Sequence, residues 1–293
     1  MRVYFLKKLP RKSSPSAILK EKKKEGVLSM RLKNGVLETA EGSYDYIQFG
    51  KGTRHLVLIP GVGDGLTTVK NKALMGAFLY KDFTKDFRVT MISRNNVPKK
   101  GATVKDFARE QAEVLHLLDI HKASVIGVSL GGMIAQELAV LEPDLIDRLV
   151  LVVTLPKANE LMIENAKTWI SMAEGDDYAG ILKDFDKKCH PNGVPAQKQL
   201  LYPFLPKPKS FERFLIQANA CITHDASAHI SEITAPTLVI GGGKDNVLGK
   251  EGSILLAEMI PNASLYIYPD LSHSLYEDAA DNFNYRVLEF LTN

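Results

Sequence analysis

The chain of 293 residues is poor in cysteine and has no long apolar run. Its two cysteines, Cys189 and Cys221, lack metal-ligand spacing and are too few for a disulfide framework, so a reduced, cytoplasmic setting is expected. No stretch of about 18 apolar residues is present, which excludes a transmembrane helix of ordinary length. The apolar fraction of 45% and charged fraction of 24% are typical of a globular protein.

The chain also lacks a strong net charge. Its net charge of +3 is the sum of two segments whose charges have opposite sign. Residues 1–29 carry nine Lys or Arg against two Glu, a net charge of +7, whereas the rest of the chain carries −4. The mildly acidic body argues against a nucleic-acid partner. We interpret residues 1–29 as a basic, partly ordered extension that could make weak peripheral contact with anionic lipid. The composition is silent on oligomeric state.

Alternating and helical hydrophobic patterns predict an α/β fold from residue 30 onward. Strands that alternate with helices imply a mostly parallel sheet, of about eight strands, with helices on both faces. Expected strands cover 30–40, 43–49, 55–60, 88–93, 123–128, 147–154, 237–241 and 264–268, and expected helices cover 73–85, 103–118, 251–259 and 275–291.

The rhythm of strand and helix stops after Pro156 and resumes at Thr237. Between them, helical patterns are broken by His-Pro-Asn-Gly and by a Pro-rich run at 203–208. We therefore expect a core made of residues 30–155 and 232–293, with residues 156–231 inserted as a helical cap.

The segment from Gly127 to Gly131 has the pattern G-x-S-x-G with Ser129 at its centre. An apolar strand precedes it and a helical pattern follows it, which is the context in which such a serine stands exposed as a nucleophile. Glycine two positions before and after the serine removes Cβ atoms that would crowd a tight turn.

A nucleophilic serine needs a base and a carboxylate that orients the base, in the chain order Ser, Asp, His for this kind of sheet. Asp245 follows the strand 237–241, and His273 follows the strand 264–268. Asp225 precedes its strand, and Asp270 is only three residues from His273, so both fit the orienting role less well. The remaining six histidines do not follow a strand in the required order.

An oxyanion formed at Ser129 needs two backbone N–H donors. The residue after the nucleophile, Leu130, supplies one, and the loop Gly61-Val62-Gly63 supplies the other, for which we favour Val62. This loop is not G-x-G-x-x-G, so a dinucleotide site is not expected. Aromatic residues of the expected cap, together with Gly61, are the candidates for substrate contact: Trp169, Tyr202 and Phe204.

These residues resemble the α/β-hydrolase fold family over positions 30–293, apart from the cap. The run Gly127 to Ala135 looks like the nucleophile elbow of its serine esterase and enol-lactonase branch, and Ile233–Ile240 with Asp245 looks like its acid strand. The usual His-Gly of the oxyanion loop stands here as Pro60-Gly61, and the usual Gly-His as Ser272-His273. A serine at the elbow argues against dehalogenase and epoxide hydrolase chemistry, which needs aspartate there.

The expected function is hydrolysis of a carboxylic ester, lactone or thioester of a small, largely apolar substrate, without metal or organic cofactor. Three alternatives stay open. One is an acyltransferase with the same triad. Another is an aminopeptidase, for which an acidic anchor could come from Glu160, Glu164, Glu174, Asp176 or Asp177. The last is a non-catalytic binding protein of the same fold.

Overall fold

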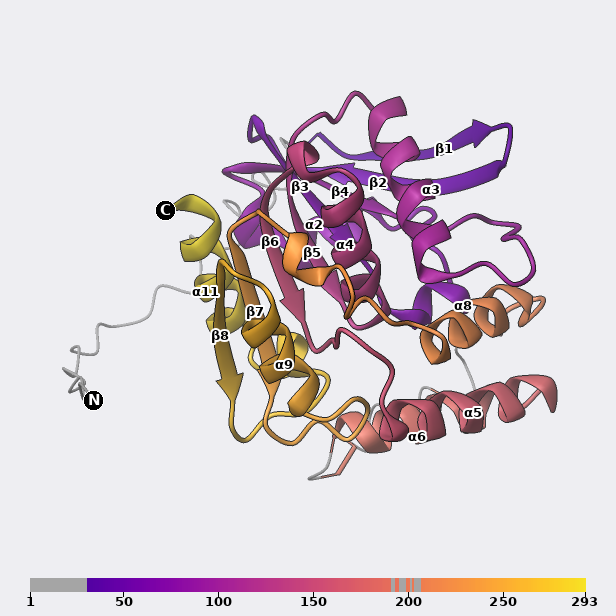
Figure 1. Cartoon of the computed structure of the whole chain (residues 1–293). Coiled ribbons are helices and arrows are strands. Elements are labelled where there is room, and N and C mark those ends of the chain that lie inside the picture. The colour runs from indigo at the N-terminus through magenta and orange to yellow at the C-terminus, as the bar shows by residue number, and fades with distance from the viewer. Residues whose placement is uncertain (1–30, 191–192, 195–198, 201, 203–206) are drawn as a thin grey trace, which may run out of the picture.

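We describe a computed structural model of the chain, which covers residues 31–190, 193–194, 199–200, 202 and 207–293. Its centre is one eight-stranded sheet in the order β1-β2-β4-β3-β5-β6-β7-β8 (Figure 1). The pairs β1–β2 and β2–β4 are antiparallel and all other neighbours are parallel, which confirms the predicted fold class. The strands are β1 (Lys33–Thr39), β2 (Gly42–Phe49), β3 (Arg54–Ile59), β4 (Phe87–Ile92), β5 (Ala123–Val128), β6 (Ile146–Val152), β7 (Thr237–Gly242) and β8 (Ala263–Tyr268).

Successive side chains of each central strand pack alternately into two separate apolar cores, one on each face of the sheet. On β3, Val57 and Ile59 join one core, and Leu56 and Leu58 join the other. The first core is covered by α3 (Val104–Leu117), α4 (Leu130–Leu141) and α9 (Glu251–Met259), and the second by α2 (Ala73–Leu79), α10 (Leu275–Asp278) and α11 (Ala280–Thr292). Burial on both faces explains why these strands are continuous apolar runs.

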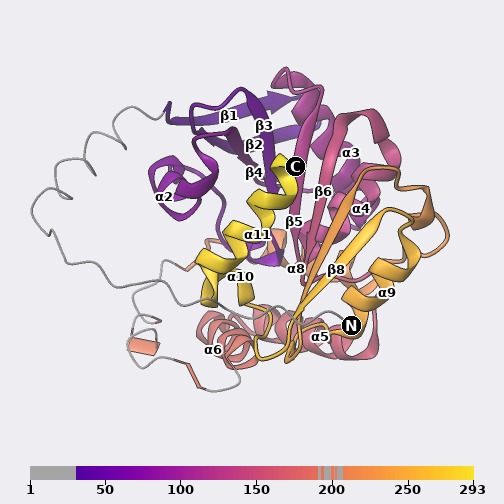
Figure 2. The same ribbon diagram turned by 90° about the vertical axis from the view of Figure 1, so that its left-hand side faces the viewer.

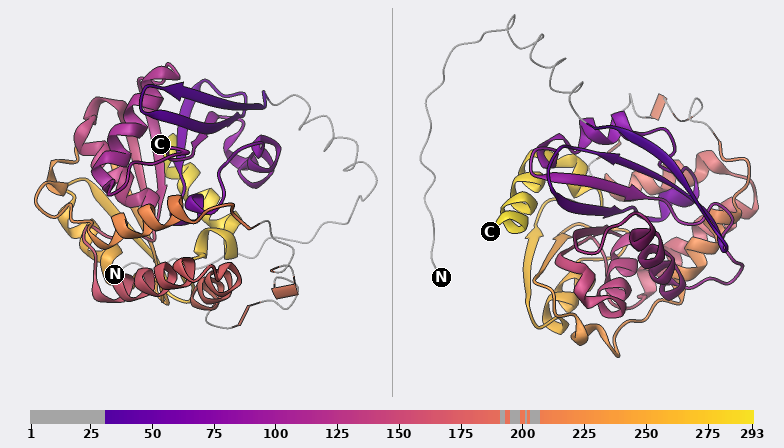
Figure 3. Two further views of the ribbon diagram at one scale, coloured as in Figure 1. Left: turned by 90° about the vertical axis from the view of Figure 1, so that its right-hand side faces the viewer. Right: turned by 90° about the horizontal axis from the view of Figure 1, so that it is seen from above.

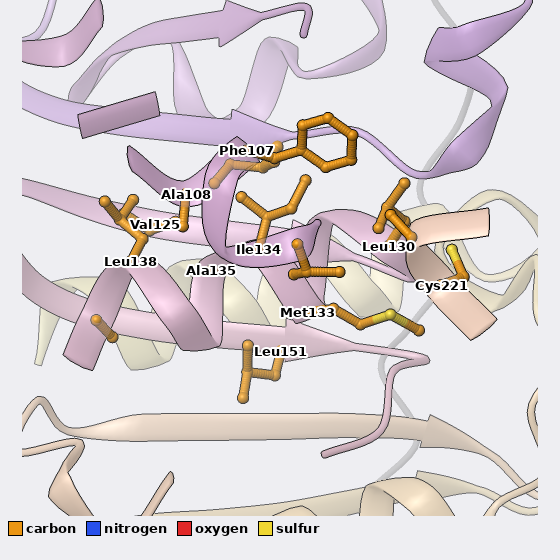
Figure 4. Packing of buried hydrophobic residues seen from close by; sticks show 14 of the residues in the cluster. Phe107, Ala108, Val125, Leu130, Met133, Ile134, Ala135, Leu138, Leu151 and Cys221 are labelled. Atoms are coloured by element: carbon orange, nitrogen blue, oxygen red, sulfur yellow. The ribbon is translucent and has the colours of Figure 1, made fainter. Parts of the chain in front are cut away.

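Helices α5 (Glu160–Glu174), α6 (Tyr178–Cys189) and α8 (Glu212–Ile222) lie between β6 and β7 in the chain. We call these three helices the helical segment. Figure 1 shows α5 and α6 beyond the carboxyl ends of the strands. Figure 4 shows Leu130 and Met133 of α4 next to Cys221 of α8, and all three belong to the first core. The core therefore continues from the sheet into the helical segment. Figure 3 shows the ribbons of this segment at one end of the sheet.

Two helices differ from the sequence prediction. The helix expected over 73–85 ends at Leu79 and is followed by a short 3-10 turn, Lys81–Phe83. In one continuous helix Phe83 would share the face of Leu79, which is 55% exposed, whereas the break buries Phe83 completely. The last helix is broken at Ala279 (φ −123°, ψ 38°) into α10 and α11.

In the part of the chain that the structure describes, no helix combines the length and the apolar character that a membrane span requires.

His224 stands where the helical segment returns to the core, and it is almost fully buried. Its carbonyl accepts from the N–H of Ala158 at 2.9 Å. Desolvation by burial lowers the pKa of His224 to about 4 from an ordinary 6.5. Between about pH 6.5 and 4, His224 is therefore mostly protonated in the unfolded chain and mostly neutral in the folded protein.

This difference predicts that the free energy of unfolding falls as pH drops from about 6.5 toward 4, since the unfolded state then binds more protons. The contribution lost by pH 4.5 is about 2–3 kcal/mol. We expect His224→Gln to lack this part of the pH dependence. Urea unfolding of both proteins at pH 7 and 4.5 measures it, and equal pH dependence in parent and variant would contradict the assignment.

Candidate active site

Ser129 occupies the sharp turn between β5 and α4. Its backbone has φ 55° and ψ −121°, a conformation that residues other than glycine rarely adopt. The Ser129 N–H donates to Val152 O at 2.9 Å, and Thr154 Oγ1 donates to Ser129 O at 2.9 Å. Neighbouring strand ends thus hold the strained turn in place, as is common where a side chain must be presented for chemistry.

The glycines on either side of Ser129 are required by close backbone approach. A Cβ on Gly127 would overlap Gly131 O, and a Cβ on Gly131 would overlap Ile59 O at the end of β3. The backbone itself is the obstacle in both cases, so rotation of a side chain could not relieve the overlap. The G-x-S-x-G spacing therefore reflects packing of the turn against β3.

Asp245 and His273 come together at the carboxyl ends of β7 and β8. His273 Nδ1 lies 2.9 Å from Asp245 Oδ2, and each side chain is only 2% exposed. Asp245 Oδ1 accepts from the N–H groups of Val247 at 2.8 Å and Leu248 at 3.0 Å. These two hydrogen bonds fix Oδ1, so Oδ2 faces the imidazole and orients it.

The rival acids have other partners. Asp225 pairs with Lys157 at 2.8 Å, and exposed Asp270 pairs with Lys244 at 3.0 Å. Four of the other histidines lie near carboxylates away from Ser129: His116 near Glu142, His121 near Asp119, His190 near Asp278 and His229 near Glu137. His229 and His121 also lie 2.9 Å from a carboxylate oxygen. Among the described histidines, His273 is set apart by its place, because it follows β8 and pairs with an acid that follows the neighbouring strand β7.

The two expected oxyanion donors flank Ser129. Leu130 is the first residue of α4, so its N–H has no acceptor within the helix and lies at the positive end of the helix dipole. On the other side, a Cβ built on Gly61 would lie 3.9 Å from Ser129 Oγ. Val62 follows Gly61 and lines the cavity at Ser129.

Arg94, at the end of β4, holds the loop that contains Val62. Its guanidinium donates to Pro60 O at 2.7 Å and to Gly61 O, and its Nε lies 3.5 Å from the carboxylate of Asp64. The C=O and N–H of a trans peptide point in opposite directions. Because Arg94 binds the Gly61 carbonyl, the N–H of Val62 points away from Arg94.

Arg213 of α8 completes this buried cluster from the helical segment. It donates to the Asp64 carboxylate at 2.9 Å, to Asp64 O at 2.7 Å and to Arg94 O at 3.0 Å. Asp64 thus lies between two arginines. Asp64 Oδ2 accepts from Arg213 and from the N–H of Arg94, whereas Oδ1 has no hydrogen-bond partner among the described residues. These bonds tie α8 to the Gly61–Val62 loop.

The sequence places Arg94 at a strand end near the cleft but does not reveal this role. The Arg94 side chain is completely buried and committed to loop carbonyls. It is therefore not free to bind an anionic substrate. A signal that could have indicated its role is an arginine directly after a buried strand with no carboxylate nearby in the sequence.

A small apolar cavity of about 20 Å³ adjoins Ser129. This volume is close to the space for one water molecule, so the cavity in this form is too small to hold a substrate. Trp169 lines the cavity, as do residues of all three helices of the helical segment. The full lining is Val62, Ser129, Met133, Met162, Ala166, Trp169, Phe185, Ala218, Cys221, Val247 and Leu248.

Of the other expected substrate contacts, Tyr202 is not part of the cavity lining, because its buried hydroxyl donates to Asp186 Oδ2 at 2.5 Å. Phe204 lies outside the described residues. Phe185 is one of the aromatic residues of the expected cap, but its contact with the candidate base was not predicted. Its ring stands edge-on to that of His273, with centroids 6.1 Å apart and planes at 89°. A lone phenylalanine in a helical pattern gives no sequence signal for this contact.

Two asparagines, also not anticipated, support the loop after Asp245: Asn159, the N-cap residue of α5, and Asn165 within α5. Asn159 Nδ2 donates to Leu248 O at 2.7 Å, and Asn165 Nδ2 donates to the carbonyls of Asn246 and Val247 at 3.0 and 2.9 Å. The loop whose N–H groups bind Asp245 is therefore itself fixed by α5. The helical segment thus contacts the supports of both the Asp245 loop and the Gly61–Val62 loop.

Comparison with known proteins agrees with this architecture. Residues 43–185 match the family model of the α/β hydrolase fold. The 2-hydroxy-6-oxononadienedioate/2-hydroxy-6-oxononatrienedioate hydrolase of Cupriavidus pinatubonensis is 27% identical over 83% of this chain and 89% of that protein.

Two solved structures show the same fold. An α/β hydrolase enzyme, MGS-M2, from a deep-sea metagenome superimposes with a TM-score of 0.76, at 20% identity over 88% of this chain and 98% of the other. The enol-lactonase of Burkholderia xenovorans superimposes with a TM-score of 0.74, at 20% identity over 88% of this chain and 100% of that chain. With its sheet order, its strained elbow at Ser129 and these matches, the chain has the α/β-hydrolase fold.

Proposed function

We propose that the protein is a serine hydrolase that cleaves a carboxylic ester, lactone or thioester of a small, largely apolar substrate. The observation that carries this proposal is the buried hydrogen bond between His273 Nδ1 and Asp245 Oδ2, together with the presentation of Ser129 at a positive-φ turn. Acyl transfer requires an imidazole that is oriented by a carboxylate and that reaches the serine hydroxyl when substrate is bound. The oriented imidazole and the half-buried Ser129 at its turn support the proposal on these grounds.

In the proposed reaction, His273 Nε2 takes the proton of Ser129 as Oγ attacks the substrate carbonyl. The N–H groups of Leu130 and Val62 stabilise the oxyanion. His273 then gives the proton to the leaving alcohol or thiol, and an acyl-enzyme remains on Ser129. Water, deprotonated by His273, attacks the acyl carbon, and the acid leaves as Ser129 regains its proton.

Cys221 is the other potential nucleophile in the cavity lining. Burial raises the pKa of its thiol to about 12, so the thiolate that a cysteine nucleophile requires is scarce at neutral pH. This supports Ser129 as the nucleophile.

The cavity lining favours an apolar acyl group over the alternatives. An aminopeptidase needs a carboxylate to hold the amine of its substrate, and none of the acidic residues considered for that role, Glu160, Glu164, Glu174, Asp176 and Asp177, lines the cavity at Ser129. Acyl transfer uses the same residues and differs only in the acceptor. It is distinguished by product formation with an added alcohol in competition with water.

A serine-reactive fluorophosphonate should label Ser129, because only a hydroxyl activated by a base reacts at a useful rate. Peptide mass spectrometry of the labelled protein identifies the modified residue. In parallel, p-nitrophenyl acetate, butyrate and octanoate measure the acyl preference. Labelling at another residue, or no ester turnover with any chain length, would rule out the proposal.

A further inference from the structure

Helix α8 rests directly on the loop that follows β3. A Cβ added to Gly65, at the end of the 3-10 turn Val62–Gly65, would lie 2.6 Å from Cα of Phe214 in α8. The two backbones therefore touch with no side chain between them. Figure 2 shows α8 between α5 and the sheet, as in Figure 1. The position of this turn, which begins at the candidate oxyanion donor Val62, is thus coupled to the position of α8.

Arg213, the second residue of α8, joins the loop after β3 to the loop after β4. Its guanidinium donates to Asp64 O at 2.7 Å in the first loop, and to Arg94 O and Asn95 O, each at 3.0 Å, in the second. A fourth bond, of 2.9 Å, runs to the carboxylate of Asp64. The planar guanidinium offers five N–H donors in a fixed arrangement, which a lysine cannot reproduce. One side chain of the helical segment thus holds both loops.

The carboxylate of Asp64 connects Arg213 to the candidate oxyanion donor. Its Oδ2 also accepts from the N–H of Arg94 at 3.1 Å, and the guanidinium of Arg94 donates to Gly61 O. Gly61 O and the Val62 N–H belong to one peptide group, so a hydrogen bond to the carbonyl sets the direction of the N–H. The side chains of Arg94 and Asp64 are 0% and 1% exposed, so this connection is shielded from water.

We propose that Arg213 of the helical segment is a positioning residue, which acts through Asp64 to hold the Val62 N–H in the direction that the oxyanion requires. The inference rests on the proposed function, because it concerns hydrolysis at Ser129. A donor stabilises an oxyanion best when its direction is fixed before the charge develops. Without Arg213, the buried carboxylate of Asp64 keeps only Arg94 as a partner, and it turns toward water or other donors.

Direct binding of substrate by Arg213 does not fit its surroundings. Its side chain is 15% exposed, and it does not belong to the lining of the cavity at Ser129. All three of its guanidinium nitrogens donate to oxygens of the protein. The loss of Arg213 should therefore weaken stabilisation of the transition state and leave binding of the substrate nearly unchanged.

Arg213→Gln in the full chain tests the proposal. We expect kcat for p-nitrophenyl ester hydrolysis to fall about 10–100-fold, as a small misplacement of a catalytic group can cause, and KM to change less than about threefold. Benzeneboronic acid, which forms a tetrahedral anion on a reactive serine, should bind more weakly by a factor similar to the loss in kcat. Arg213→Lys keeps the charge without the planar fork and should show a smaller loss of both.

Two further measurements separate positioning from a general loss of structure. End-point labelling by a fluorophosphonate counts the active molecules, and partial misfolding would lower kcat in proportion to this count while the Kd of the boronic acid stayed the same. Hydrogen exchange without substrate should be about tenfold faster in Arg213→Gln than in the parent at residues 60–66.

A double-mutant cycle tests the route through Asp64. Asp64→Asn should also lower kcat, and Asp64→Asn/Arg213→Gln should be slower than the slower single variant by no more than about threefold. The matched control is Arg109→Gln, which removes an arginine of α3 that is 63% exposed and pairs with Asp106. This control should keep kcat within about twofold of the parent.

An active parent whose kcat and boronic acid affinity are unchanged in Arg213→Gln would overturn this inference alone. Losses that multiply in the double variant would overturn the route through Asp64. A parent that hydrolyses no ester and is not labelled at Ser129 would overturn the proposed function, and this inference with it.

Discussion

Replacement of Ser129 by alanine is expected to lower kcat for ester hydrolysis by about 10⁴-fold or more, because no acyl-enzyme can form. The fold should be preserved, since the backbone partners of Ser129, Val152 and Thr154, do not involve its hydroxyl. Steady-state kinetics on the best p-nitrophenyl ester, with thermal unfolding as a check on folding, measures the effect. Residual turnover reflects only the oxyanion donors and binding.

Ser124→Ala is the matched control for this prediction. Ser124 lies on β5, the strand that leads to Ser129, and is buried five residues before it. Its replacement should leave kcat within a few fold of the parent. Equal ester hydrolysis by the parent and by Ser129→Ala would remove the central assignment.

Asp245→Asn is expected to lower kcat by about 10³–10⁴-fold while the structure stays intact. Asp245 Oδ1 accepts two backbone N–H groups, from Val247 and Leu248. The asparagine must keep its carbonyl oxygen there, so its NH₂ group faces His273 Nδ1. Nδ1 must then accept, the ring proton moves to Nε2, and Nε2 can no longer take the proton of Ser129.

Asp270→Asn provides the control for charge near the base. It is three residues from His273 but exposed and paired with Lys244. Because exposed pairs contribute little, this variant should keep nearly full activity. A loss of activity as large for Asp270→Asn as for Asp245→Asn would contradict the assignment of the acid. The kinetics should be measured over a range of pH, since a purely structural defect would not change the shape of the profile.

Much of the fold could be read from local pattern. The strand before Ser129, the order of Ser129, Asp245 and His273, and the resumption of strands at Thr237 each depend on residues close together in the chain. Parallel strands bring their carboxyl ends to one edge of the sheet, so residues that follow them are expected there together. The meeting of His273 and Asp245 is therefore a consequence of topology.

Other features depend on contacts between segments far apart in the chain. The break after Leu79 follows from the burial of Phe83, which no helical periodicity encodes. Tyr202 was expected at the substrate, but its hydroxyl finds Asp186 on α6. The use of Arg94 to hold the Gly61 carbonyl depends on how β3 and β4 are paired.

The sequence by itself determined the α/β architecture, the identity of the candidate nucleophile and the order of its partners, because periodicity and strand ends are local properties. Only the tertiary structure decided how these groups are held: Asn159 and Asn165 fix the loop after Asp245, and Arg94, Asp64 and Arg213 fix the Gly61–Val62 loop. It also decided that Leu74, Met75, Phe78 and Leu79 of α2 face outward, since helical spacing defines an apolar face but not what that face contacts.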